Sequence, residues 1–380
     1  MANEISTWLK FAIQQMAAES YLNGINLQDP AAVIGRLVDG NNNSQVIPPD
    51  QFTGKTRFVN LTGVPNASQV TGSAQAFVSR YQIVDHHAND ATGFSATLMK
   101  DPNTGQYTLS FRSTESAPAV QGGDRERDLF GADAEIGASG FAFGQLAAME
   151  EYLARLKQGI KSDGNVDLTL QAFFSNPNHT LNVTGYSLGG HLATVFTEIH
   201  NPEVNQTYLF NAAGRGHVPG AVPGLLAEET RIQDMLTYFR SVLDNPDNAL
   251  ASFPRGTTYQ QAKALYDTQA TTWHPFDQGS TTLYSDARYE WAKAATQALF
   301  NPSGLTFLQT PGEVQDQGPF AKIIQLYGQA TTDDLQFVAN SGVHAPAIPV
   351  FIEGQPLIAG GLLPSFTESG NTHSITLLVA

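Results

Sequence analysis

Two stretches of the chain repeat apolar side chains at helical spacing. Over residues 138–157 they recur mostly at steps of three and four, and residues 5–22 show a similar repeat. We therefore expect a helix with one buried face over 138–157 and an amphipathic, core-covering helix over 5–22. Residues 23–80 are rich in Asn, Gly and Pro without a sustained period, which indicates loops and short elements.

Other stretches have the pattern of strands. Residues 94–99 and 106–112 are β-prone and are joined by the turn-forming sequence DPNTG, which predicts a hairpin. An apolar strand is expected over 180–184, a helix over 188–199 and another strand over 207–210.

The alternation of strands and helices predicts an α/β protein whose central sheet is mostly parallel and flanked by helices. Further strands are expected over 321–327 and 347–352. The intervening residues 217–320 are too many for an ordinary connection and contain helix-like runs, so we interpret them as an inserted cap or lid. Residues 1–216 and 321–380 then form the two parts of the core.

Composition narrows the class of partner. The chain of 380 residues has 20 basic and 35 acidic side chains, a net charge of −15 that disfavours nucleic acid as a partner. It has no cysteine, which excludes disulfides, thiol nucleophiles and thiolate metal ligands. Its first residues lack the pattern of a Sec-type signal; we expect secretion by a route that needs no disulfides, with the cytoplasm as the alternative.

The candidate nucleophile lies between an expected strand and an expected helix. Residues 185–189 read GYSLG, with Ser187 at the centre, directly after the strand and before the helix. A serine held in a sharp strand-to-helix turn needs neighbours without bulky side chains, and the glycines supply them. The first amide of the following helix, that of Leu188, can donate to a tetrahedral oxyanion.

These residues resemble the class 3 lipase family. The similarity lies in GYSLGGHLA at 185–193 and in LSFRST at 109–114, with an acidic stretch at 128–133. The resemblance implies an α/β-hydrolase fold and makes Thr114 the second oxyanion donor. Ser113 departs from the family pattern, which usually has glycine there.

The general base should follow the nucleophile and the acid in chain order. His373 lies after a loop punctuated by Gly and Pro and before a final apolar run. Its segment GNTHSI resembles the histidine region of cysteine-free bacterial lipases, whose longer relatives carry calcium-binding repeats that this sequence lacks. His191, one helical turn after Ser187, is interpreted as a packing or capping residue.

The acid should follow the strand that precedes the histidine loop. Asp334 comes after the strand expected at 323–327, and it resembles the family's aspartate that leads into an apolar turn. Four more carboxylates could serve in its place: Asp333, Asp244, Asp247 and Asp277.

Two apolar segments suggest how a substrate would be held. One forms a helical face that fits either a mobile lid or packing within a cap; its members are Leu225, Leu226, Ile232, Met235, Leu236, Phe239, Val242 and Leu243. The other surrounds Leu362 and Leu363 near His373 and is consistent with an acyl-binding wall.

The predicted reaction is two-step acyl transfer through an acyl-enzyme on Ser187, with no cofactor. A triacylglycerol lipase that makes transient contact with lipid interfaces is the leading hypothesis. Phospholipase A1, a general esterase and a catalytically silent binding module of the same fold stay open, as do calcium binding and the oligomeric state.

Overall fold

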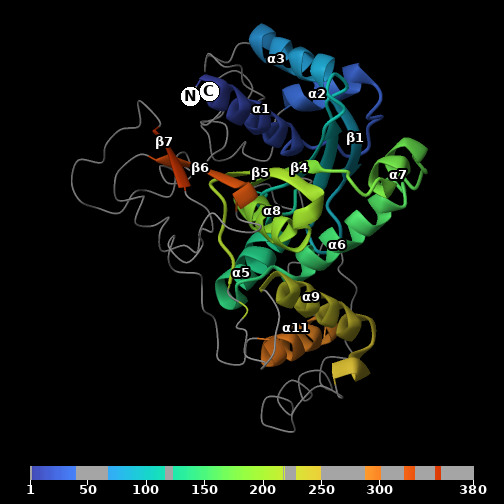
Figure 1. Ribbon diagram of the computed structural model, residues 1–380, viewed down its shortest axis with the longest axis vertical. Coiled ribbons are helices and arrows are strands. Elements are labelled where there is room, and N and C mark those ends of the chain that lie inside the picture. Colours follow the sequence, from blue (N-terminus) through green and yellow to red (C-terminus); the bar gives the residue numbers. More distant parts are fainter. Residues whose placement is uncertain are drawn as a thin grey trace, which may run out of the picture.

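The computed structural model places helices on both sides of one central sheet (Figure 1). It describes residues 2–39, 67–115, 123–216, 218, 228–249, 287–300, 321–329 and 347–351. The strands are β1 (Gln82–His87), β2 (Ala96–Lys100), β3 (Tyr107–Phe111), β4 (Leu181–Tyr186), β5 (Val204–Phe210), β6 (Ile323–Gln329) and β7 (Ala347–Phe351).

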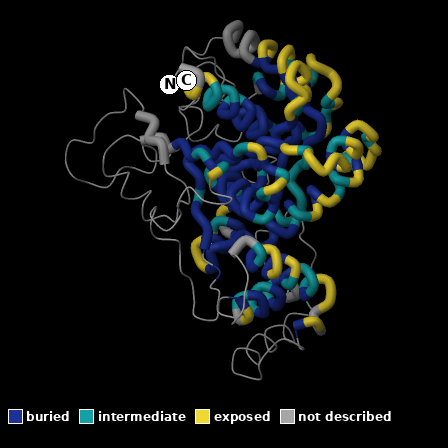
Figure 2. The backbone as a smooth tube through the Cα atoms, in the orientation of Figure 1, coloured by how far each residue is buried: buried dark blue, intermediate teal, exposed yellow. Residues whose placement is uncertain are grey.

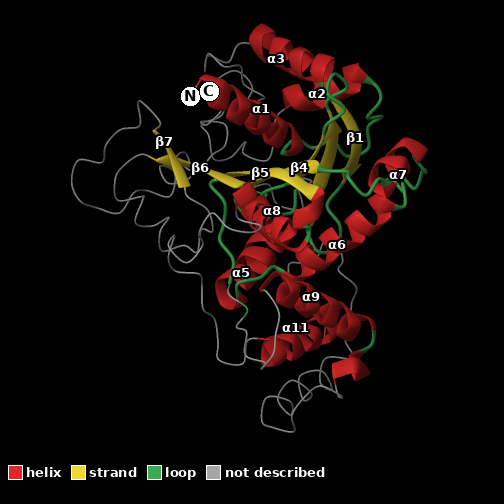
Figure 3. Cartoon of the chain, viewed as in Figure 1, coloured by secondary structure: helices red, strands yellow, loops and turns green. Residues whose placement is uncertain are grey.

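The helices, drawn in red in Figure 3, differ widely in length. The longer ones are α1 (Ala2–Ala18), α2 (Pro30–Asp39), α3 (Ala67–Arg80), α6 (Phe143–Lys157), α7 (Leu168–Ser175), α8 (Leu188–Ile199), α9 (Glu228–Asp244) and α11 (Ala287–Phe300). The shorter ones are α4 (Arg125–Arg127), the π-helix η2 (Asp128–Asp133), α5 (Ala134–Ser139), and the 3₁₀ turns η3 (Asn201–Glu203) and η4 (Pro246–Ala249).

The seven strands lie side by side in chain order. β1, β2 and β3 form an antiparallel meander, and β3 to β7 are parallel. Crossovers between parallel strands are right-handed, so a sheet that always advances in one direction places its crossover helices on one face. α6 and α8 contact each other on that face, and α8 also contacts β3, β4 and β5. The opposite face must therefore be covered by another part of the chain.

Helix α1 covers this second face, and it contacts β2, β3, β4 and β5. Strand residues alternate between the two sides: Leu209 belongs to the core under α8, whereas Tyr208 and Phe210 belong to the core under α1. The ring of Phe11 stacks on that of Tyr208 at 4.0 Å between centroids. The central strands are buried from both sides as a result (Figure 2).

The expectation of loops and short elements over residues 23–80 is wrong in part. α2 buries Val33 and Leu37, and α3 buries Ala74 and Phe77. α3 contains many small or polar residues, so its helical repeat is weak in the sequence. α2 has an apolar repeat through Val33, Ile34, Leu37 and Val38, but it spans only ten residues within a stretch rich in Asn, Gly and Pro. β1 is not predicted by the sequence pattern either, because its buried positions include polar side chains such as Asp85.

Other predicted elements are confirmed. β2 and β3 form the expected hairpin, and α8 has the bounds predicted for it. The helix expected over 138–157 is interrupted, because Gly140 ends α5 in a left-handed conformation with φ 84° and α6 starts at Phe143. None of the described helices is long and apolar enough to cross a membrane.

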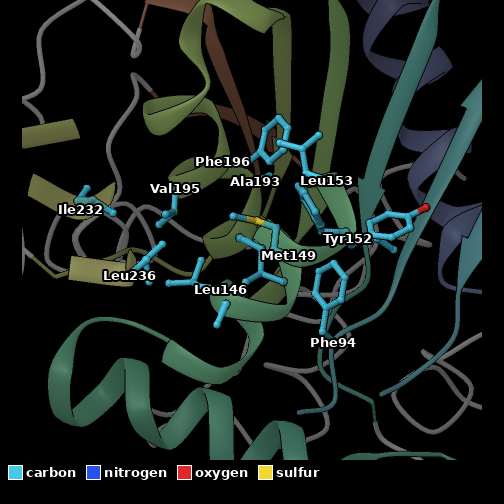
Figure 4. Close-up of a cluster of buried hydrophobic side chains, with 14 of the residues drawn as sticks. Phe94, Leu146, Met149, Tyr152, Leu153, Ala193, Val195, Phe196, Ile232 and Leu236 are labelled. Atoms are coloured by element: carbon cyan, nitrogen blue, oxygen red, sulfur yellow. The ribbon is translucent and has the colours of Figure 1, made fainter. Parts of the chain in front are cut away.

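The described part of residues 217–320 forms a layer of two helices on the core. α9 contacts α6 and α8, and α11 packs on α9. Ile232 and Leu236 of α9 lie beside Leu146 and Val195 of the core (Figure 4). In α9, the apolar face proposed for a lid is thus occupied by packing; Leu225 and Leu226 lie outside the described residues.

Candidate active site

Ser187 occupies a strained turn between β4 and α8. Its backbone has φ 52° and ψ −119°, one of two positive φ values outside glycine among the described residues. Such a conformation costs about 1–3 kcal/mol and persists where its surroundings fix it. The Ser187 amide donates to the Phe210 carbonyl at 3.2 Å, and the Ser187 carbonyl accepts from the amides of Gly190 and Ala213, each at 2.9 Å. The turn is therefore tied to α8 and to the segment after β5.

Two glycines of the turn are required by close packing. A Cβ atom at Gly185 would lie 2.7 Å from the Gly190 nitrogen, and one at Gly189 would lie 2.7 Å from the Arg112 carbonyl oxygen. Carbon atoms do not approach backbone atoms this closely without displacement. The first turn of α8 thus rests directly against the end of β3, as the strand–turn–helix interpretation requires.

The ends of β3 and β4 bring the predicted oxyanion residues to the same edge of the sheet as Ser187. Phe111 pairs with Gly185 in the parallel ladder, so Thr114 and Ser187 both follow the carboxyl ends of neighbouring strands. Leu188 opens α8, where amides and the helix dipole favour negative charge. The buried Leu188 side chain packs with three other apolar residues: Ala132, Ile136 and Ala142.

The Thr114 side chain has a defined partner that the sequence did not identify. Its hydroxyl donates to Asp133 Oδ2 at 2.9 Å. Asp133 is the last residue of the π-helix η2, and burial raises the pKa of its carboxyl to about 6. The acidic stretch 128–133 carries part of the family resemblance, but a π-helix shifts side-chain directions away from the α-helical repeat, so the sequence pattern does not single out Asp133.

A cluster of buried charges lies beside this loop. The Glu115 amide donates to Asp128 Oδ2 at 2.7 Å, and Arg112 pairs with the Glu115 carboxylate at 3.1 Å. Arg127 pairs in the same way with Asp124 at 3.1 Å. Burial, reinforced by Glu115, raises the pKa of Asp128 well above its usual range, and burial also raises that of Asp124 to about 7. Among the residues described, no group of three or more His, Asp or Glu side chains could hold a metal ion.

His191 has the packing role expected for it. It is fully buried; its Nδ1–H donates to the Gly214 carbonyl at 3.0 Å, and its Nε2 accepts from the Ala142 amide at 3.3 Å. Burial lowers its pKa to about 4, so the ring is neutral near pH 7. His191 therefore fastens α8 to two loops, and its ring nitrogens are both engaged in doing so.

Several predicted site residues lie outside the described part of the chain. These are Asp334, His373, Leu362 and Leu363, together with the candidate acids Asp333 and Asp277. Two further candidate acids are described: Asp244 is the last residue of α9 and is exposed, and Asp247 lies in η4. The structure therefore places Ser187, Leu188 and Thr114 at one edge of the sheet, and the base and acid remain predictions from the sequence.

Solved structures that are similar to this chain include two fungal lipases. No protein-family model matches the chain, and no curated protein matches its sequence. The chain is similar to the Lip2 lipase from Yarrowia lipolytica, with a TM-score of 0.33, 12% identity, and coverage of 63% of this chain and 65% of that one. It is also similar to a lipase from Rhizopus microsporus var. chinensis, with a TM-score of 0.24, 14% identity, and coverage of 38% and 50%. The match thus spans less than two thirds of either lipase.

The observed architecture is compatible with an α/β-hydrolase fold. Its sheet is parallel from β3 to β7, helices cover both faces, and a strained serine joins β4 to α8. The more specific resemblance to class 3 lipases continues to depend on the sequence motifs around Ser187 and Thr114.

Proposed function

We propose that this chain is a serine carboxylic-ester hydrolase that acts through an acyl-enzyme on Ser187. The observation that carries the proposal is the conformation of Ser187, which is strained, glycine-flanked and placed at the start of α8. Strained backbone conformations cluster at functional sites, and a serine in a strand–turn–helix elbow projects its hydroxyl where a substrate can reach it.

In the proposed reaction, the Ser187 hydroxyl attacks the ester carbonyl while His373 accepts its proton and later delivers it to the leaving alcohol. Asp334 orients the His373 ring and stabilises its cation. The oxyanion receives hydrogen bonds from the amide of Leu188 and from Thr114. Water, activated by the same histidine, then releases the carboxylic acid and restores Ser187.

The substrate we favour is a triacylglycerol. The apolar segment that contains Leu362 and Leu363 lies close to His373 in sequence and supports a wall for an acyl chain. A phospholipid ester or a small soluble ester would pass through the same two steps, because neither changes the carbonyl chemistry at Ser187.

The deciding experiment is labelling with a fluorophosphonate probe, followed by a release assay on p-nitrophenyl esters, triacylglycerols and phospholipids. We expect the wild type to be labelled and Ser187→Ala to be neither labelled nor active, with an unchanged melting temperature. Turnover by Ser187→Ala above roughly a hundredth of wild type would contradict the nucleophile assignment. An unlabelled and inactive wild type would instead favour a silent binding module.

The acid and base are tested by the same assay. His373→Ala and Asp334→Asn should each lower kcat by about 10⁴, and the double variant should be hardly worse than His373→Ala, because the triad acts as a unit. Asp333→Asn is the matched control, since it changes an adjacent carboxylate. If Asp277→Asn or Asp244→Asn is the crippling change instead, the acid comes from residues 217–320.

A further inference from the structure

A set of buried polar side chains joins α1 to the two strands that carry the proposed site. We call this set, made of Gln15, Glu19, Ser110, Ser113 and Thr184, the α1 seam. Exposure is 0% for Gln15, Glu19, Ser110 and Thr184, and 3% for Ser113. The seam lies within the otherwise apolar contact between α1 and the sheet.

Gln15 bridges β3 and β4. Its Nε2 donates to the Phe111 carbonyl at 2.8 Å, and its Oε1 accepts from the Thr184 hydroxyl at 2.7 Å. The Thr184 hydroxyl is in turn 2.6 Å from that of Ser110 on the neighbouring strand. One amide therefore fixes the strand that runs on to Thr114 against the strand that ends at Ser187.

Glu19 holds the segment just beyond β3. Its carboxylate accepts the Ser113 hydroxyl at 2.7 Å and the Ser113 amide at 3.2 and 3.3 Å. It also accepts a hydrogen bond from Gln15 Nε2 at 2.8 Å. Hydrogen bonds to a carboxylate are stronger and shorter than neutral ones, and a buried carboxylate without its donors is costly. Ser113 is thus held at two points, directly before Thr114.

The packing of α1 on the sheet does not by itself require the polar side chains of the α1 seam. Phe11 and Met16 already bury apolar surface against the same face of the sheet, and apolar side chains would satisfy packing at lower desolvation cost. The polar contacts instead fall on Phe111, Ser113 and Thr184, all within three residues of Thr114 or Ser187. A buried polar network whose members are hydrogen-bonded makes the structure more rigid and specifies one arrangement of the core.

We propose that Glu19 is a positioning residue: by holding Ser113, it sets the position of the next residue, Thr114, which is the proposed second oxyanion donor. The inference rests on the proposed ester hydrolysis. It gives a reason for the departure at position 113, because a serine there offers the Glu19 carboxylate a hydroxyl as well as an amide.

The test compares Glu19→Gln and Ser113→Ala with a matched control, Asp85→Asn. Asp85 is a buried carboxylate that accepts the Ser162 hydroxyl at 2.7 Å, the Ser162 amide at 3.0 Å and the Tyr152 hydroxyl at 3.0 Å. It therefore makes almost the same contacts as Glu19, but on β1, which two strands separate from β4.

Reactive sites are first counted with the fluorophosphonate probe, so that kcat refers to correctly folded protein. Glu19→Gln retains one acceptor oxygen in place of two, and we expect kcat per labelled site to fall about 10- to 100-fold with little change in KM. The Ki of a trifluoromethyl ketone, which forms a tetrahedral adduct, should rise by the same factor. Ser113→Ala should show a smaller loss in the same direction, and the double variant should lose hardly more than Glu19→Gln.

The Asp85→Asn control separates an effect on the position of Thr114 from a general loss of stability. Asp85→Asn should lower the melting temperature as Glu19→Gln does, with unchanged kcat per labelled site and unchanged Ki. If Glu19→Gln and Ser113→Ala keep wild-type kcat and Ki, or if Asp85→Asn loses as much of both, the inference is overturned while the hydrolase assignment stands. A wild type that neither labels nor hydrolyses esters removes the assignment and this inference together.

Discussion

The contact between α8 and the end of β3 can be tested by adding one methyl group. Gly189→Ala would place a Cβ atom 2.7 Å from the Arg112 carbonyl oxygen and 2.8 Å from the Phe111 carbonyl carbon, where ordinary contacts begin at 3.4 Å. Both neighbours are backbone atoms at the end of β3, so they cannot rotate aside as a side chain could. The Phe111 carbonyl oxygen lies closer still to that Cβ atom, so restoring ordinary contact moves α8 and the end of β3 apart by about 1 Å.

This displacement separates the two proposed oxyanion donors, because Leu188 moves with α8 and Thr114 moves with the segment that follows β3. A misplacement near 1 Å can lower a rate by about 10², and overpacking typically costs about 1–3 kcal/mol of stability. We therefore expect Gly189→Ala to lose about 10- to 100-fold in kcat per labelled site. Its free energy of unfolding, from urea titration, should fall by about 1–3 kcal/mol.

The matched control is Gly35→Ala in α2. No atom lies within 4 Å of a Cβ added there, so alanine should raise stability by about 0.5–1 kcal/mol and leave activity unchanged. Wild-type kcat in Gly189→Ala would refute the close contact between α8 and β3 as a requirement for the reaction.

Three further predictions concern individual contacts. Thr114→Val removes the hydroxyl, which donates to Asp133 in this structure and would turn to the oxyanion during the reaction. We expect kcat on p-nitrophenyl esters to fall about tenfold with KM unchanged, and an unaltered kcat would limit Thr114 to its backbone amide. Burial raises the pKa of Glu135 to about 7 from 4.5, so the folded state binds its proton more tightly than the unfolded chain and stability falls as pH rises from 4.5 to 7. Glu135→Gln should remove up to about 3 kcal/mol of the difference in unfolding free energy between pH 5 and pH 8, as measured by urea titration. The same difference in both proteins would contradict this prediction. Arg215→Met should lower the free energy of unfolding by about 3–5 kcal/mol, because it removes the cation that lies 2.6 Å from the buried Glu198 carboxylate. Adding Glu198→Leu should recover part of this loss, which urea titration of the single and double variants would measure.

The sequence by itself determined those helices and strands whose buried faces consist of apolar residues at regular spacing. The hairpin of β2 and β3 and the helix α8 were predicted close to their observed bounds, since strong alternation or a 3.6-residue repeat needs no knowledge of distant partners. The same holds for the turn at Ser187, where glycine spacing between a strand and a helix implies close backbone approach.

Only the tertiary structure decided which polar side chains are buried and which partners they bind. Gln15 and Glu19 fall four residues apart near the end of an amphipathic helix, where a pattern assigns polar side chains to solvent, yet both are fully buried. Their partners are distant in the chain: Thr184 lies 169 residues after Gln15, and Ser113 lies 94 residues after Glu19. A buried polar group is stable only when such partners are in place, and the hydrophobic pattern of a single chain contains no record of which polar groups will meet.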